Sequence, residues 1–150
     1  MYYRLGTSGN FTTSIPVAST AGSYTVYYYA AATTNYNQSS TGSVTATIAK
    51  ANSAVSFSGN GTVQVGATMT KTLTRTAGDG AISYSSSNTG IATVNSSGTV
   101  TGVAAGSCTI TGTSGASTNY NSASATYTLT VSTPGISATY QNSTYARIYF

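Results

Sequence analysis

Short runs of β-branched and aromatic residues, separated by Gly, Asn and Ser, recur along the whole chain. This pattern predicts many short strands joined by turns. Stretches with a helical period are missing, and Thr-rich segments are poor helix formers because their χ1 angle is restricted. Ser and Thr are abundant enough to suggest disorder, but the regular runs argue against it. We therefore expect an all-β fold.

The second half of the chain repeats a pattern from the first half. The segment 22–30 predicts a strong strand, and 42–48 predicts another, in which apolar residues alternate with Thr. The matched segments are 22–26 with 106–110, 35–37 with 119–121, and 44–48 with 127–131, the last pair shifted by one residue. A repeat of this length is typical of tandem domains.

The repeat predicts three parts. If 106–131 closes one domain, then 22–48 closes an earlier one, so residues 1–49 hold only the C-terminal half of a domain. Residues 51–133 are long enough for a complete seven-stranded sandwich. Residues 134–150 begin a further domain or form a strand-like tail, whose strand-prone residues are Tyr145, Ile148, Tyr149 and Phe150.

Eight strands are predicted between residues 54 and 131, separated by turn signals. They are Ala54–Phe57, Thr62–Val65, Met69–Arg75, Ala81–Ser86, Ile91–Val94, Thr99–Val103, Cys108–Thr113 and Tyr127–Val131. Asp79 followed by Gly80 predicts a hairpin turn. The segment Asn95–Gly98 predicts a turn in which Gly98 takes a positive φ.

Two stretches of this region carry a family signature, Ser87–Val94 and Gly98–Ile110, and Val63–Thr68 fits the same signature. The pattern resembles the bacterial immunoglobulin-like domain, group 2, over about residues 54–131. Residues 1–49 are similar to the second half of related repeats, anchored by Ala21–Val26. The resemblance implies tandem immunoglobulin-like β-sandwiches, the first one incomplete.

Domains of this family are spacers or binding modules in bacterial surface adhesins, secreted enzymes and tailed-phage virion proteins. The fold alone does not determine which of these roles applies. This chain departs from the family in having few of the charged residues that often decorate such domains.

The residue inventory excludes most enzyme chemistry. The chain has no His, one acidic residue, Asp79, and one Cys, Cys108. A carboxylate pair, a Ser–His–Asp triad and a Cys–His pair are therefore impossible. A zinc site usually needs four Cys, His or carboxylate ligands, and only two such residues exist. We expect no enzymatic activity, no metal and no cofactor.

Charge and hydropathy limit the partners. Charged residues make up 4% of the chain, against roughly a quarter in an ordinary domain. With so little charge repulsion between copies, the protein is expected to be part of an assembly. The net charge is +4, but the basic residues are scattered rather than gathered for nucleic acid. No apolar run is long enough to span a membrane. Met1–Gly6 lacks the apolar core of a signal peptide, so either export information lies elsewhere or the chain is not secreted by a cleaved signal.

Two aromatic features are candidate contact sites for glycans or partner proteins. Tyr27, Tyr28 and Tyr29 place aromatic rings on both faces of one strand, either as an interface or as one core ring and two surface rings. The repeated Asn-Tyr-Asn loops offer Tyr36 with Asn37, and Tyr120 with Asn121. These loops either bind sugars or pack back on the sandwich and stabilise the hairpin.

The first domain lacks its opening strands, for one of two reasons. Either the chain is part of a longer protein, or a neighbouring chain supplies strands, for example from its 136–150 tail. We predict a structural or decoration module of a surface assembly, most specifically a fibre, decoration or tail protein of a tailed-phage virion. Its partners are copies of itself or other structural proteins. The alternative is a bacterial cell-surface adhesin that binds glycans.

Overall fold

The computed structural model describes residues 1–135, 137–140 and 146–149. Across these residues the protein is all-β, with strands β1 to β16 and no helix, which confirms the predicted fold class. The chain forms two compact units. Unit 1 comprises residues 1–51 and 118–120, and unit 2 comprises residues 52–117 and 121–150. The division into an incomplete and a complete sandwich remains a prediction.

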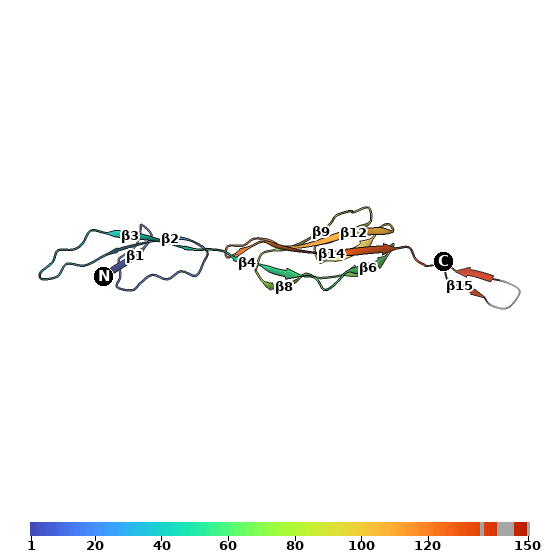
Figure 1. Ribbon diagram of the computed structural model, residues 1–150, viewed down its shortest axis with the longest axis horizontal. Helices are drawn as coiled ribbons and strands as arrows, with labels where there is room; N and C mark the ends of the chain where they lie inside the picture. Colours follow the sequence, from blue (N-terminus) through green and yellow to red (C-terminus); the bar gives the residue numbers. More distant parts are fainter. Residues whose placement is uncertain (136, 141–145, 150) are drawn as a thin grey trace. The chain divides into compact units, whose positions relative to one another are not determined.

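Unit 1 contains one antiparallel sheet, in the order β1-β2-β3 (Figure 1). β2 (Gly22–Tyr29) and β3 (Gly42–Ile48) are the two strands predicted from the sequence. β1 (Tyr2–Leu5) was not predicted, and it pairs with the C-terminal half of β2. Its aromatic and branched residues suit a strand, but four residues are too few to show a clear alternation.

Unit 2 is built from a four-stranded sheet, β6-β14-β12-β9, and a three-stranded sheet, β10-β11-β7, with a separate β5–β8 pair. The strands are β5 (Ala54–Ser56), β6 (Gly61–Gln64), β7 (Thr68–Thr70), β8 (Thr74–Ala77), β9 (Ile82–Ser86), β10 (Ala92–Val94), β11 (Thr99–Gly102), β12 (Gly106–Ser114) and β14 (Ala123–Ser132). The two shortest strands, β4 (Ala51–Asn52) and β13 (Tyr120–Asn121), pair with each other.

The core of unit 2 is a cluster of apolar side chains from both sheets. Along β12 and β14 buried residues alternate with outward-facing Ser and Thr, because successive side chains of a strand point to opposite faces. Ile110, Leu129 and Val100 are fully buried. Cys108 also faces the core, since its free thiol belongs to this cluster.

The predicted strand Met69–Arg75 is wrong, because the chain changes sheet within it. β7 pairs with β11, whereas β8 pairs with β5. Between the two strands Leu73 is buried, and its backbone N–H donates a 2.9 Å hydrogen bond to the Tyr84 hydroxyl. A side chain therefore satisfies the amide that no neighbouring strand reaches.

The predicted hairpin turn at Asp79 and Gly80 is also wrong. β8 pairs with β5 and β9 pairs with β12, so this segment connects strands of different sheets. Gly78 has a φ of 108°, a conformation that favours glycine. The Arg75 guanidinium donates a 2.5 Å hydrogen bond to the Gly80 carbonyl and holds the connection in place.

The turn predicted at Asn95–Gly98 is confirmed. It joins β10 to β11, which pair antiparallel, and Gly98 has a φ of 78°. The Asn95 side-chain oxygen accepts hydrogen bonds from the amides of Ser97 (2.9 Å) and Thr99 (3.0 Å). An Asn side chain thus stabilises its own turn.

Two further strands follow unit 2's sheets along the chain. β15 (Ser137–Tyr140) and β16 (Ala146–Tyr149) pair antiparallel, with Ser137 opposite Tyr149. The predicted tail residues Ile148 and Tyr149 therefore lie in a strand. Ile136, Tyr145 and Phe150 lie outside the described residues.

Candidate interaction surfaces

The outward face of the four-stranded sheet in unit 2 is lined with hydroxyl groups. Register places Ser and Thr opposite one another on adjacent strands β9, β12 and β14. We call this set the hydroxyl face: Ser83, Ser85, Ser107, Thr109, Thr111, Thr113, Ser124, Thr126, Thr128 and Thr130. Two of its cross-strand pairs lie at hydrogen-bonding distance, 2.8 Å for Thr113–Ser124 and 3.3 Å for Ser107–Thr130. The three strands contain no charged residue, so this face offers uncharged donors and acceptors only.

Tyr27 and Tyr29 lie on one face of the unit 1 sheet. Tyr29 stacks on Tyr2 with 5.3 Å between ring centroids. The Arg4 guanidinium lies 5.3 Å from the Tyr27 ring and 4.6 Å from the Phe11 ring. These contacts form an aromatic cluster around one cation on this face of the sheet.

Tyr28 lies on the opposite face of the same sheet, which is mainly apolar. Strand alternation and register bring together the residues that we call the open face: Tyr3, Leu5, Tyr24, Val26, Tyr28, Val44, Ala46 and Ile48. Val44 is 56% exposed, Leu5 39% and Tyr28 36%. The Tyr28 ring lies over Gly42, where a Cβ atom would come within 2.7 Å of it. The sequence therefore places aromatic residues on both faces as predicted, but with different surroundings.

No residue of unit 1 is buried. In unit 2, by contrast, the equivalent alternation produces fully buried Ile110 and Leu129. A sheet with one apolar face gains most of its stability when that face is covered. Within the described residues, the open face has no such cover.

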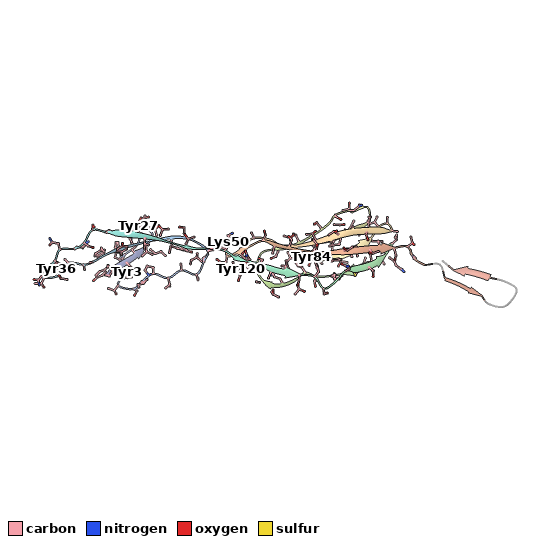
Figure 2. The ribbon with its side chains drawn as sticks, in the orientation of Figure 1. Tyr3, Tyr27, Tyr36, Lys50, Tyr84 and Tyr120 are labelled. Carbon is pink, nitrogen blue, oxygen red and sulfur yellow. The ribbon has the colours of Figure 1, made fainter. Side chains whose placement is uncertain are left out.

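The two Asn-Tyr-Asn loops differ. In the first loop Tyr36 is 78% exposed and Asn37 is exposed, so the expectation that Tyr36 packs back on the sheet is wrong. Figure 2 shows Tyr36 at the tip of the β2–β3 hairpin. In the second loop Asn119 accepts a 2.8 Å hydrogen bond at its side-chain oxygen from the Ala21 amide. Its carbonyl accepts a second, of 2.9 Å, from the Ala51 amide.

The second loop also makes hydrogen bonds to residues that are distant in the sequence. Tyr120 is half-buried in β13. Asn121 accepts a 2.6 Å hydrogen bond from the Ser53 hydroxyl at its carbonyl and donates a 3.0 Å bond to the Asn52 side chain. Since these groups satisfy one another, Tyr36 and Asn37 are the more available pair for a ligand.

The Tyr127 hydroxyl is a polar group inside the unit 2 core. Its side chain is 4% exposed, and its hydroxyl is buried without a hydrogen-bond partner in the described structure. Burial, followed by the nearby Cys108 and Tyr84 groups, raises the pKa of the Tyr127 hydroxyl above its ordinary value of 10.0. The Lys71 ammonium lies 4.9 Å from the Tyr127 ring and donates to the Gly59 and Asn60 carbonyls at 2.8 and 2.7 Å. These contacts hold a loop against the core rather than forming a reactive pair.

The described residues contain no group of three His, Cys, Asp or Glu side chains that could hold a metal ion. Among them there is also no helix with the length and hydropathy needed to span a membrane.

An incomplete first domain was predicted from the sequence, but the residues that make up the open face were not. The alternation of Val44, Ala46 and Ile48 was visible in the sequence, but the strand that brings Tyr3 and Leu5 beside them was not predicted. The missing signal was the partnership of β1 with β2, which depends on contacts between distant residues.

Residues 54–124 match the family described as the bacterial Ig-like domain, group 2, which confirms the resemblance predicted for this region. No curated protein is similar enough to the chain to count as a relative.

Two solved structures of an S-layer protein are similar to parts of this chain. Domains 4 and 5 of the S-layer protein SbsC share 26% identity at a TM-score of 0.41, covering 75% of this chain and 58% of that one. Domains 1–6 of surface layer protein SbsC share 26% identity at a TM-score of 0.42, covering 79% and 18% respectively. The chain thus spans less than two thirds of either structure.

Proposed function

Because residues 54–124 are a group 2 bacterial immunoglobulin-like domain, we propose that the chain is a non-enzymatic structural module of a surface-exposed assembly. Its partners are other copies of itself or other structural proteins. The family match is the observation that carries this proposal, since domains of this family act as spacers and binding modules.

The hydroxyl face supports an architectural role. Burying a charged group against a neighbour costs free energy unless the charge is paired, whereas a hydroxyl needs only one hydrogen bond. A face of paired Ser and Thr without charges can therefore pack against many polar surfaces. The sequence also has no His and a single acidic residue, which leaves few groups for proton transfer.

The specific assembly that we propose is a tailed-phage virion, in which the chain is a fibre, decoration or tail component. Support comes from the charge-poor sequence, at 4% charged residues, and from the occurrence of the resembled family in virion proteins. A test is to band particles and cell envelopes from the source culture on a density gradient. Peptides of this chain should peak with the particles, and a peak with the envelopes would contradict the virion assignment.

A bacterial adhesin that binds glycans is the second candidate, and the exposure of Tyr36 favours it. A tyrosine ring that is 78% exposed at a hairpin tip can stack on a sugar, with the exposed Asn37 beside it to bond hydroxyls. A glycan array should lose its signal on Tyr36→Ala and keep it on Thr34→Ala, a control in the same loop. An array that is silent for the unmodified chain would exclude this role.

A further inference from the structure

Unit 1 reproduces part of the four-stranded sheet of unit 2. The β2–β3 hairpin has the register of β12–β14, and β1 lies along β2 as β9 lies along β12. The corresponding pairs are Gly22–Ile48 with Gly106–Val131, Tyr24–Ala46 with Cys108–Leu129, and Tyr3–Tyr28 with Tyr84–Gly112. By this correspondence the open face matches the buried face of the unit 2 core.

Two elements that complete unit 2 have no counterpart in unit 1. In unit 2 the outer edge of β14 pairs with the parallel strand β6, whose Val63 enters the core. In unit 1 the same edge of β3 has no neighbour among the described strands. An open edge beside an apolar face is a template for another strand.

The second layer is also missing. In unit 2, β10 and β11 lie between β9 and β12 in the chain, and their Ala92 and Val100 are fully buried. In unit 1, the segment between β1 and β2 forms only a single bridge, from Tyr3 to Thr12. There Ile15 is 71% and Val17 91% exposed.

The chain itself contains strands that belong to neither main sheet. β15 and β16 pair with each other and with no other described strand, so each has an open edge. A two-stranded hairpin alone is at best marginally stable in water. β15 and β16 each have four residues, as does β6, the strand that occupies the equivalent edge in unit 2.

Charge favours contact at the open face. The only charged side chains in residues 1–51 are Arg4 and Lys50. Arg4 lies on the opposite face, enclosed by Phe11 and Tyr27, and Lys50 follows the end of β3. No charge on the open face would therefore need to be desolvated when a strand adds there.

We propose that the open edge of β3 accepts one strand of the β15–β16 hairpin of a second copy of this chain, which extends the sheet beside the open face. This inference rests on the proposed structural role and names the contact between copies. Donor and acceptor are different surfaces, so the contact is head-to-tail and builds open chains unless it closes into a ring.

The test uses two variants of the full chain. Val44→Lys places a charge on the open face and disables the acceptor, with Thr45→Lys as a matched control on the other face of the same strand. Ala138→Pro removes a strand amide from β15 and disables the donor. Neither position lies in the unit 2 core, so unchanged hydrogen exchange of β12 and β14 shows that unit 2 remains folded.

Light scattering across a concentration series gives the result. The unmodified chain and the Thr45→Lys control should form particles of more than two chains. Val44→Lys alone and Ala138→Pro alone should each remain a monomer of 15.1 kDa. An equimolar mixture of Val44→Lys and Ala138→Pro should form a dimer, because one supplies the donor and the other the acceptor. Self-assembly of Ala138→Pro together with loss of assembly in Val44→Lys would show face-to-face pairing and overturn the hairpin as donor. A monomeric unmodified chain at about 100 µM, well above ordinary dissociation constants, would overturn contact between copies. Either result would leave the gradient test of the virion assignment unaffected.

Discussion

At the residue scale, polar side chains inside unit 2 form hydrogen bonds with backbone groups at places where the chain passes from one sheet to another. The Tyr84 hydroxyl accepts the Leu73 amide where the chain leaves one sheet for the other. The Tyr127 hydroxyl, only a few strands away, is buried without a partner in the described structure. The same type of side chain is therefore expected to have opposite effects on stability at these two positions.

Tyr84→Phe should destabilise unit 2 by about 1–3 kcal/mol, because the Leu73 amide would lose the hydroxyl that accepts its hydrogen bond between β7 and β8. Chemical denaturation measures the change in unfolding free energy. Ile82→Val in the same strand is a control for general weakening of β9, since Ile82 is 37% exposed. Equal effects of the two substitutions would contradict the role of the hydroxyl.

Tyr127→Phe should leave the unfolding free energy unchanged or raise it by about 1 kcal/mol at neutral pH, because it removes an unsatisfied buried hydroxyl. The folded-state pKa of Tyr127 lies above 10.0. Above pH 10.0 the unfolded state therefore loses this proton more readily than the folded state does. The free energy of unfolding is unaffected by the titration of this group below pH 10.0 and falls as the pH rises from there through the folded-state value.

The unmodified chain should accordingly lose stability relative to Tyr127→Phe above about pH 10. Denaturation of both proteins between neutral and alkaline pH measures the difference and cancels the titration of the other tyrosines. A difference that does not change with pH would show that the Tyr127 hydroxyl ionises as easily in the folded state as in the unfolded state.

At the element scale, local patterns predicted most of the longer strands but not the sheets to which they belong. The alternation along β12 and β14 and the Asn95–Gly98 turn follow from neighbouring residues, and both are present in the structure. The break between β7 and β8 depends on which distant strand each one meets, and this is invisible in a local run of Thr and Leu. For the same reason the exposure of Tyr36 could not be read from its repeated motif.

Asn95→Ala should weaken the β10–β11 hairpin by about 1 kcal/mol, because its side chain accepts hydrogen bonds from two turn amides. Faster hydrogen exchange at Ser97 and Thr99 would locate the effect in the turn. Ser96→Ala, an exposed substitution in the same turn, should change neither exchange nor stability. Unaltered exchange in Asn95→Ala would contradict the capping role of this side chain.

At the scale of the whole molecule, the two units differ in how completely their sheets are covered. Unit 2 has an apolar core between its sheets, whereas unit 1 has no buried residue. Few buried contacts mean a low free energy of local opening. Unit 1 should therefore depend on a partner for its stability, and unit 2 should not.

Amide hydrogen exchange of the dilute chain should show strong protection in β12 and β14 and weak protection in β2 and β3, although the two hairpins share a register. Raising the protein concentration should slow exchange in β3 while leaving β12 unchanged. Equal protection of both hairpins at all concentrations would mean that the unit 1 sheet is stable without a cover.

If this chain is a structural module on the outside of an assembly, antibodies should reach it in intact particles or cells. Immunogold electron microscopy of intact particles or cells from the source, with antibodies raised against the 150-residue chain, tests this claim most directly. Gold should label the outer surface of intact material, without prior lysis. Labelling that appears only after the particles or cells are opened would contradict it.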